Sequence, residues 1–296
     1  MQIKVENVGV VLITFNPSIK NLQRKIKQII QRKIQVVIVN NGQKLNLTDN
    51  AYLKVIDLLQ NKGIAFAQNA GVNWLHEMKY KYVFFFDQDS EFEDTYFDDM
   101  LRFWNEISLK NANLGVLSPN LFDRNRNENI SINRINDGEV SRIYPEKNKK
   151  QFINNTLPIS SGILTTVEIF NSIHGNNEKM FIDWVDFDFD LRILEAGYDI
   201  FTVSQVCLYH AIGKATRHNF LGHSLFPSNH APFREFYYFR NGIFLYRHKK
   251  EKFPEIKKMI RNALIVRLVY CLYEKNKIKR VTNISQGIVA GIMNRI

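Results

Sequence analysis

The sequence predicts an α/β fold with a doubly wound sheet and a helical C-terminal extension. Three continuous apolar and β-branched runs, at residues 8–13, 35–39 and 82–86, predict parallel strands buried on both faces. Segments with helical periodicity separate these runs, as in folds that alternate strands and helices. Short polar segments follow each run directly. Ligands of doubly wound sheets bind at the carboxyl ends of the strands, so these segments are candidates for one binding crevice.

The elements alternate regularly through residue 90. After the first strand, Leu22, Ile26 and Ile29 recur at helical spacing, with Lys and Arg opposite them. After the second strand, Ile64 and Val72 mark the faces of another helix. The three strand ends read Thr14-Phe15-Asn16, Asn40-Asn41-Gly42 and Asp87-Gln88-Asp89.

The later part of the chain is less regular. Residues 120–155 contain nine Asn, which predicts loops and small strands over one face. Apolar character returns at residues 158–164. We expect a helix to open near Asp183 and a strand to end near His210. The pattern after residue 232 is helical almost to the end, with a break near Pro254.

Composition excludes several classes of protein. The 296-residue chain is 45% hydrophobic, enough for a full core and too much for a disordered chain. Its two cysteines, Cys207 and Cys271, argue against a disulfide framework and suit a reducing compartment. The N-terminal residues do not form a secretory signal, and no apolar run reaches the ~20 residues that span a bilayer. We therefore expect a cytoplasmic protein, soluble or bound to a membrane surface.

The net charge of +11 is concentrated in one segment. Residues 234–296 carry 15 Lys and Arg against 4 Asp and Glu, whereas residues 1–233 carry 25 of each sign. A neutral body with a basic tail suggests a polyanionic partner for the tail, either nucleic acid or a membrane.

Two carboxylates, Asp87 and Asp89, directly follow a buried strand. Alternate residues of an extended segment face the same way, so both can approach one cation. Hard oxygen ligands of this kind suit Mg²⁺ or Mn²⁺ held against a diphosphate. The alternative is a strand-end turn that caps the next helix. The Asp-x-Asp pattern by itself favours neither interpretation.

A second acidic cluster follows Phe181. On a helix, Asp183, Asp186 and Asp190 share a face, and Asp188 points elsewhere. Acidic residues in a first turn also stabilise the helix dipole, which is the alternative explanation. Four carboxylates among aromatic residues exceed what capping needs. Like charges close together raise the pKa of one member, which suits a general base.

The motifs, taken in order, resemble the inverting glycosyltransferases of family 2, which have the GT-A fold, a Rossmann-like mixed sheet. The resemblance covers residues 8–241. Within the family, the sequence is most similar to the rhamnosyltransferase branch of bacterial surface-polysaccharide and O-antigen synthesis. The matching segments are Thr14-Phe15-Asn16-Pro17, residues 61–65, residues 67–72, Phe86-Asp87-Gln88-Asp89-Ser90, Ser161-Gly162, residues 181–186, Gly197-Tyr198, residues 210–213 and residues 234–241.

The resemblance implies a role for each matching residue. Asp186 matches the catalytic base. Residues implied in nucleotide-sugar binding are Thr14, Asn16, Asn40, Asn69, Asp87 and Asp89. The divalent metal, Mn²⁺ or Mg²⁺, would be held by Asp89, Asp87 and His210. Contacts to the acceptor or to phosphate would come from Asp183, Trp184, Asp188, Arg217 and Arg240. The chain departs from the family at Asn40, where Asp is usual, and at Asp188, where Glu is common.

The implied reaction is inverting transfer of L-rhamnose from dTDP-L-rhamnose to a hydroxyl of a saccharide or lipid-linked saccharide. A UDP-hexose or galactofuranosyl transferase of the same fold is the nearest alternative. A two-metal nuclease or phosphatase also needs clustered carboxylates. A nucleic-acid-binding protein would explain the basic tail but not the acidic clusters, so we expect no nucleic-acid partner. No Gly-x-Gly-x-x-Gly follows the first strand, which disfavours a dinucleotide dehydrogenase.

We expect a GT-A domain at residues 1–233, in which residues 1–110 bind the nucleotide sugar and residues 111–233 face the acceptor. The basic helical region at residues 234–296 interleaves aromatic and apolar residues with cations. This pattern suits helices that lie on the anionic inner face of the cytoplasmic membrane. The alternative is a set of helices packed against the body, which could also form a homodimer contact.

Overall fold

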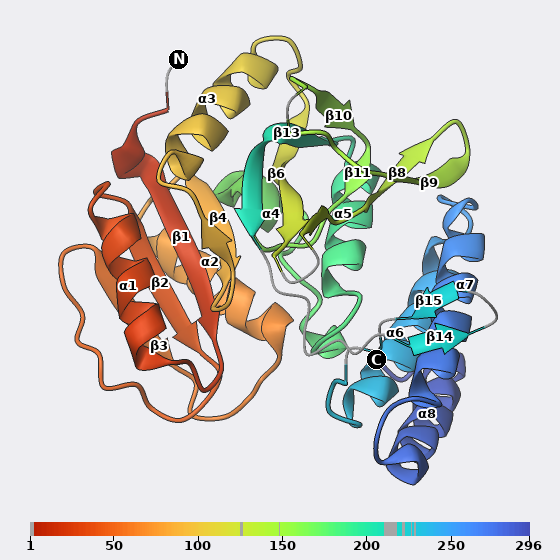
Figure 1. Cartoon of the computed structure of the whole chain (residues 1–296). Coiled ribbons are helices and arrows are strands. Elements are labelled where there is room, and N and C mark those ends of the chain that lie inside the picture. Colours follow the sequence, from red (N-terminus) through yellow and green to blue (C-terminus); the bar gives the residue numbers. More distant parts are fainter. Residues whose placement is uncertain are drawn as a thin grey trace.

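The computed structural model describes residues 3–124, 127–147, 149–209, 218–220, 223–225, 227 and 229–296. Within these ranges a ten-stranded mixed sheet forms the centre of the molecule, in the order β10-β13-β6-β12-β4-β1-β2-β3, with β5 paired to β13 and β7 paired to β6 (Figure 1). The parallel part contains β1 (Val8–Thr14), β2 (Gln35–Asn40), β3 (Leu53–Asp57) and β4 (Tyr82–Asp87). The three strands expected from the apolar runs are therefore confirmed.

Helices cover both faces of this sheet, as the doubly wound prediction requires. Apolar residues of α1 (Ile19–Ile30) and α3 (Tyr96–Ser108) pack with alternate residues of β1 and β4 in one core. The opposite residues of the same strands pack against α2 (Ile64–Glu77), α4 (Val167–Ser172) and α5 (Val185–Glu195). Since successive strand residues face opposite sides, both sides of each run must be apolar. This explains the unbroken runs in the sequence.

The second half of the sheet mixes strand directions. The short strand β12 (Leu164–Thr166) runs antiparallel between β4 and β6 (Leu114–Asp123). Outside β6 lie β13 (Asp199–Tyr209), which is parallel to it, and β10 (Phe152–Asn154), with the two-residue strands β5 (Glu91–Phe92) and β7 (Glu128–Asn129) alongside.

The segment with many Asn residues forms small strands, as predicted. These are β8 (Ile132–Asn136), β9 (Glu139–Ile143) and β11 (Thr156–Leu157), which make a separate three-stranded sheet. The 3₁₀ helices η1 (Val5–Asn7) and η2 (Glu178–Met180) and the pair β14 (His218–Phe220) and β15 (His223–Leu225) complete the described elements before the C-terminal helices.

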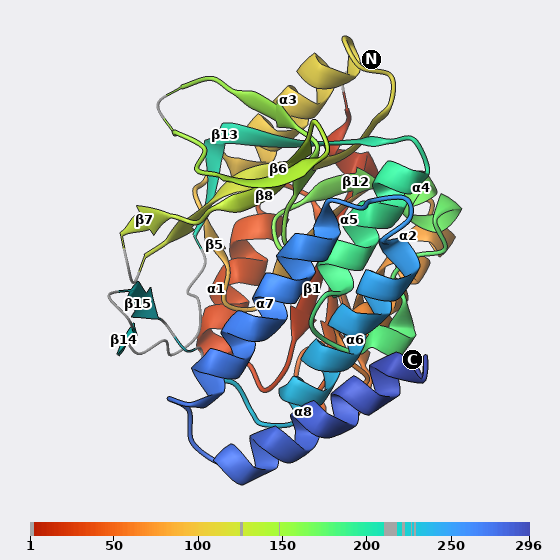
Figure 2. The same cartoon turned by 90° about the vertical axis from the view of Figure 1, so that its right-hand side faces the viewer.

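The C-terminal region forms the helices α6 (Arg234–Lys249), α7 (Ile256–Cys271) and α8 (Lys277–Ile292), which lie together on one side of the body (Figure 2). Gly287 and Gly291 of α8 rest on the backbone of α6, where a Cβ atom would stand 2.4 Å from the carbonyl oxygen of Phe236 and 2.9 Å from that of Arg240. This close approach requires glycine at both positions. Among the described residues no helix combines the length and the apolar character needed to cross a bilayer.

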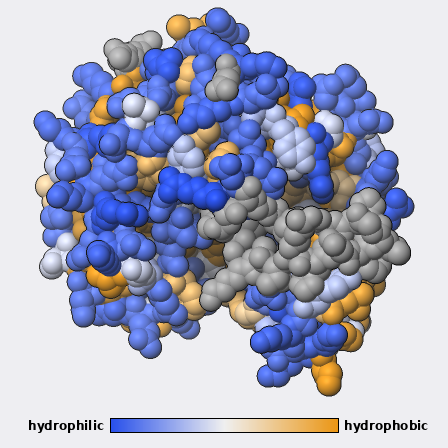
Figure 3. Space-filling view, viewed as in Figure 1, coloured by the Kyte–Doolittle hydropathy of each residue, from blue (hydrophilic) through white to orange (hydrophobic). Residues whose placement is uncertain are grey.

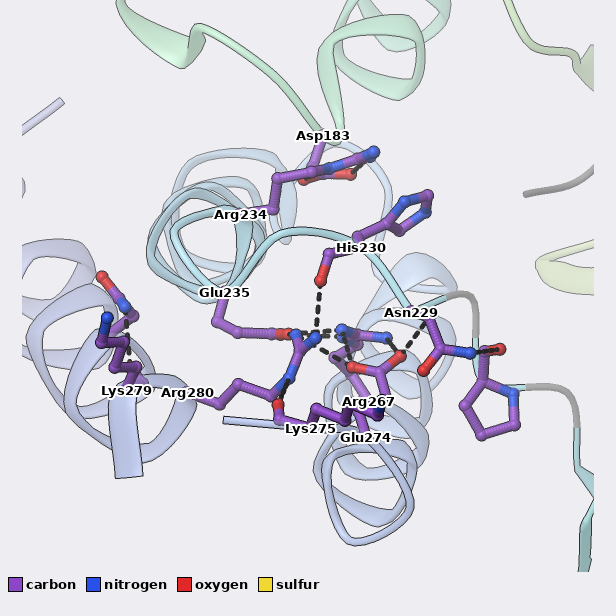
Figure 4. Close-up of polar contacts among 12 residues, drawn as sticks. Asp183, Asn229, His230, Arg234, Glu235, Arg267, Glu274, Lys275, Lys279 and Arg280 are labelled. Atoms are coloured by element: carbon purple, nitrogen blue, oxygen red, sulfur yellow. Dashed lines mark hydrogen bonds and ion pairs between the residues drawn. The ribbon is translucent and has the colours of Figure 1, made fainter. Parts of the chain in front are cut away.

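A buried ion-pair network ties these three helices together (Figure 4). Glu235 of α6 and Glu274 accept hydrogen bonds from Arg267 of α7, at 2.7 Å from Nε to Glu235 and 2.7 Å from Nη2 to Glu274. Arg280 of α8 pairs with the same two carboxylates, and all four side chains are almost wholly buried. Buried charges of this kind are tolerated because each is paired and hydrogen-bonded. Two of the basic residues in the tail therefore serve internal packing.

Candidate functional site

The carboxyl ends of the parallel strands meet at one edge of the sheet, where the predicted polar segments come together. Thr14 lies beside Asn40 across β1 and β2, and Asn40 lies beside Asp57 across β2 and β3. On the other side, Ile13 of β1 lies beside Asp87 of β4. The strand ends therefore meet at one edge of the sheet, as the sequence predicts, but Thr14, Asn40 and Asp57 face one side of it and Asp87, in register with Ile13, faces the other.

Two of the predicted nucleotide-binding residues are used inside this edge. Asn40 is 0% exposed, and its amide nitrogen donates to the Gln43 carbonyl at 2.6 Å and to Asp57 at 2.7 Å. Its amide oxygen accepts from the Thr14 hydroxyl at 3.2 Å and from the Gly42 amide at 3.3 Å. The side chains of Thr14 and Asn40 thus fix the shape of the strand-end loops.

The surface of the edge is formed by other residues. Phe15 is 48% exposed, and Asn16 beside it is also exposed, with a left-handed backbone. Gln88 holds the two strand-end segments together, because its side chain accepts from the Phe15 amide at 2.8 Å and donates to the Phe15 carbonyl at 3.2 Å. An aromatic ring and polar groups at a strand edge can contact a planar base and a ribose.

A buried lysine supports the Asp-Gln-Asp turn from beneath. The Lys25 ammonium, on α1, donates to the carbonyl oxygens of Asp87 at 3.0 Å and Gln88 at 2.7 Å. Burial lowers the pKa of Lys25 to about 8, although the charges of Asp89 and Asp87 oppose the shift. Helical periodicity places Lys25 beside Ile26, but no motif in the sequence marks it as part of the site.

The two carboxylates of the turn repel each other. Asp89 is exposed, and Asp87 is partly buried. Burial and then the charge of Asp89 raise the pKa of Asp87 to about 6. Ser161 accepts a hydrogen bond from the Asp87 amide at 3.1 Å, which fixes the strand end. A close pair of carboxylates whose charges disfavour each other is a donor set that fits a hard divalent cation.

The second acidic cluster begins with an unusual turn. Phe181, Asp183 and Trp184 have positive φ angles of 64°, 61° and 64°, a conformation that non-glycine residues rarely adopt. The helix α5 starts only at Val185, so the predicted helical face that included Asp183 is wrong. Left-handed residues cannot continue a right-handed helix, and Asp183 therefore precedes it.

Hydrogen bonds from distant segments hold this turn. The Asn241 amide nitrogen, on α6, donates to the carbonyl oxygens of Met180, Ile182 and Asp183 at 2.8, 3.0 and 2.9 Å. The Ile64 amide donates to the Phe181 carbonyl at 2.7 Å. Gly63 lies so close to Phe181 that a Cβ atom would be 2.4 Å from its carbonyl oxygen. The turn is thus fixed from α2 and from α6.

Asp186 lies in the first turn of α5. Burial raises its pKa to about 6, against hydrogen bonds from the side chain and backbone of Ser160. The charges of Asp87 and Asp183 raise its pKa further, so Asp186 lies within electrostatic reach of the Asp-Gln-Asp turn as well as of its own cluster. Its Oδ1 atom is buried and has no hydrogen-bond partner among the described residues. A carboxylate with this pKa and a free oxygen can accept a proton near neutral pH.

One turn further along α5, Asp190 is 1% exposed. Burial and the charge of Asp186 raise its pKa well above the usual range. Asp188 instead pairs with Arg192, at 2.8 Å from Nε to Oδ2, and is 3% exposed. The expectation that Asp188 points away from Asp186 and Asp190 is consistent with this pairing.

The other predicted residues have defined partners. Asn69 donates to the Asn176 carbonyl and to Glu178, both at 2.9 Å. The Trp184 indole donates to the Tyr238 carbonyl at 3.0 Å. Arg240, 8% exposed, donates to the Met180 carbonyl at 3.3 Å and to that of Lys179. His210 and Arg217 lie outside the described residues.

Asp183 and Asp186 open onto a cleft of about 1320 Å³ between α5, the β8–β9 hairpin, α6 and α7. There the Nε and Nη2 atoms of Arg234 donate to the two carboxylate oxygens of Asp183, at 3.1 Å from Nε (Figure 4). His230, which also lines the cleft, has its pKa lowered to about 4 by burial and by the charge of Arg234, so its ring is neutral. Arg234 belongs to the matching segment at residues 234–241, but its pairing with Asp183 was not predicted from the sequence.

Asp186 thus lines the cleft and also lies close enough to Asp87, at the carboxyl edge of the sheet, to feel its charge. A sequence profile described as "Glycosyl transferase family 2" matches residues 9–173, more than half of the chain. The chain belongs to glycosyl transferase family 2. The match ends before α5, so the profile covers the sheet edge and not Asp186 itself.

Individual relatives are more distant. The chain is 28% identical over 201 residues to "dTDP-rhamnosyl transferase RfbF" of Shigella flexneri, a match that covers 67% of this chain and 64% of the relative. A structure of S. aureus TarS 1-349 superposes over 97% of this chain and 81% of TarS, with a TM-score of 0.54 and 14% identity. GalNAc-T7, crystallised with UDP, GalNAc and Mn²⁺, superposes over 89% of this chain and 54% of that chain, with a TM-score of 0.54 and 13% identity. These likenesses confirm the predicted GT-A fold.

Lys25 provides a test of this site. Replacing it by Met leaves two carbonyl oxygens without their donor and removes a buried positive charge close to Asp87 and Asp89. We expect Lys25→Met to lower the free energy of unfolding by about 2–4 kcal/mol, measured by urea denaturation. Lys27→Met, at an exposed position of the same helix, is the matched control. Equal stability of the two variants would contradict the role of Lys25.

Proposed function

We propose that this glycosyltransferase transfers L-rhamnose from dTDP-L-rhamnose, with inversion, to a hydroxyl of a saccharide or lipid-linked saccharide. The observation that carries the proposal is the position of Asp186. Its carboxyl feels the charge of Asp87 at the sheet edge, and it also lines the separate cleft. A base between two binding regions suits a reaction in which two substrates meet.

The nucleotide sugar binds at the carboxyl edge of the sheet in this proposal. Phe15 and Asn16 offer the exposed surface for the base and ribose, and Thr14 and Asn40 fix the loops from within. Asn69 acts in the same way, since its amide holds the segment at Asn176 to α2.

Asp87 and Asp89 would hold a divalent cation, Mn²⁺ or Mg²⁺, against the diphosphate. The presence of Mn²⁺ in the GalNAc-T7 crystal structure supports this choice. The bound cation would offset the negative charge of the leaving diphosphate. Lys25 keeps the two carboxylates of the turn in place by bonding the carbonyl oxygens of Asp87 and Gln88.

Asp186 takes the proton of the acceptor hydroxyl at its free oxygen while the hydroxyl oxygen attacks the anomeric carbon. The bond to the diphosphate breaks on the opposite face, so the configuration inverts. The raised pKa of Asp186 strengthens it as a base, and Ser160 orients it by hydrogen bonds. Asp183 and Arg234 form one wall of the cleft where the acceptor would lie, and Trp184 and Tyr238 offer aromatic faces to a sugar ring.

The donor assignment rests on the relative named a dTDP-rhamnosyl transferase. Because that match is distant, a UDP-hexose or galactofuranose donor is the competing assignment. Turnover of dTDP-L-rhamnose compared with that of UDP-glucose and UDP-galactose at equal concentration distinguishes the two assignments.

Asp186→Asn tests the base. An amide cannot take the proton, so we expect turnover to fall by about 10²–10⁴-fold with donor binding nearly unchanged. Wild-type kcat/KM should fall as the pH drops through about 6, because Asp186 must be ionised to accept a proton. Both are measured as dTDP release that depends on added acceptor. Near-normal turnover in the variant, or full activity well below pH 6, would exclude Asp186 as the base.

We also propose that the C-terminal helices bind an anionic membrane surface. Leu272, Ile278 and Val281 are 59%, 85% and 59% exposed, and Lys277 and Lys279 lie next to Ile278. Figure 3 shows hydrophobic residues on the surface over α8. Exposed apolar residues flanked by cations suit an interfacial helix.

Flotation with vesicles of phosphatidylglycerol and phosphatidylcholine tests this contact. We expect the wild-type protein to float at low salt and less at high salt, since the attraction is partly electrostatic. Ile278→Ser with Val281→Ser should reduce flotation several-fold. Leu109→Ser, at an 82% exposed position at the end of α3, should not. Absence of flotation at low salt, or equal loss in both variants, would refute membrane docking.

A further inference from the structure

Several basic residues that line the cleft next to Asp186 have no acidic partner among the described residues. Two of its basic residues already have acidic partners, because Arg234 pairs with Asp183 and Arg267 pairs with Glu235 and Glu274. Four others line the same cleft without an ion pair to any residue that the structure describes. They are Arg142 of β9 and Lys257, Lys258 and Arg261 of α7.

These cations are gathered at one end of the cleft. Lys257, Lys258 and Arg261 occupy the first turns of α7, the positive end of its dipole. β9, which carries Arg142, packs on the same helix (Figure 1). Three acidic residues without an ion pair in the described chain, Glu139, Glu255 and Asp186, also line the cleft, so the four cations outnumber them. The excess charge has no structural use within the described residues.

The neighbouring wall of the cleft is apolar. Ile265 and Val266 follow the cations along α7 and are 51% and 44% exposed, and Tyr270 lies one turn further. Such a surface normally costs free energy in water unless a ligand or partner covers it. Cations beside exposed apolar residues match a ligand that is anionic at one point and apolar next to it.

We propose that the acceptor carries a phosphate group, as an ester or a diphosphate, and that Arg142, Lys257, Lys258 and Arg261 bind this phosphate while Asp186 deprotonates the acceptor hydroxyl. This inference rests on the proposed function of Asp186. The Arg guanidinium groups can bind phosphate oxygens in pairs, and the Lys ammonium groups add point charges. The phosphate thus sets the direction in which the saccharide enters the cleft.

Calorimetric titration with three probes of one hexose tests the proposal. The probes are the methyl glycoside, the 1-phosphate, and a 1-diphosphate that carries a fifteen-carbon isoprenyl chain. Mn²⁺ and saturating dTDP are present, so that the probes cannot enter the donor site. We expect the 1-phosphate to bind at least about tenfold more tightly than the methyl glycoside.

Lys258→Gln with Arg261→Gln should remove most of this preference. The matched control is Lys27→Gln with Lys110→Gln, which removes two exposed charges from the body and should leave the preference intact. Equal binding of the phosphorylated and neutral probes, or an equal effect of both double variants, would overturn the proposal.

The third probe separates two sources of the phosphate. If the isoprenyl diphosphate binds more tightly than the 1-phosphate, and Ile265→Ser with Val266→Ser removes the difference, the acceptor is lipid-linked. If the two probes bind alike, the phosphate belongs to a water-soluble saccharide or polymer. Either result supports the phosphate site.

Failure of the proposed function gives a different signature. In that case dTDP does not bind, and the titrations are repeated without it. A phosphate preference that depends on Lys258 and Arg261 would then still establish the anion site. Binding of dTDP without any phosphate preference would refute this inference and leave the proposed donor site intact.

Discussion

The turn from Phe181 to Trp184 is the constraint on which the site depends. Three of its residues have positive φ angles, each of which costs about 1–3 kcal/mol unless the surroundings enforce it. Asn241 provides that support by donating to three carbonyl oxygens of residues 180–183, and Gly63 allows the turn to approach α2 closely. The turn sets where α5 begins and therefore where Asp186 lies. The first helix of the basic tail is thus part of the site.

Most acidic residues around Asp186 are compensated by a nearby cation. The acidic residues on either side of Asp186 each have a different form of compensation: Asp87 and Asp89 lie over Lys25, whereas Asp183 pairs with Arg234. Asp186 has no cation as a partner among the described residues, and its pKa is raised. The same logic holds in the tail, where Glu235 and Glu274 neutralise Arg267 and Arg280. The charges left over on α7 and β9 are then available for a ligand.

Much of this arrangement was predictable. Apolar runs located β1, β2 and β4, because strands covered on both faces must be apolar at every position, and the carboxyl-edge rule then placed Asn40 and Asp87 at the same edge of the sheet. The left-handed Asp183 was not predictable, because its conformation is enforced by Asn241, 58 residues away. Lys25 and the buried Arg267 were missed for a related reason. Periodicity places an ionisable residue on a helix face but does not reveal which distant carbonyl or carboxylate it meets. The roles of individual site residues stay predictions.

Binding of the donor tests the roles of Asp89 and Asp186 together. The thermal shift given by dTDP-L-rhamnose with Mn²⁺ is compared in the wild type, Asp186→Asn and Asp89→Asn. A ligand at about 100 times its Kd adds about 2.7 kcal/mol, a shift of several degrees. If the proposed donor site is correct, this shift appears in the wild type and in Asp186→Asn, because the base does not hold the donor, and is lost in Asp89→Asn. No stabilisation of the wild type, or full stabilisation of Asp89→Asn, would contradict the proposed donor site.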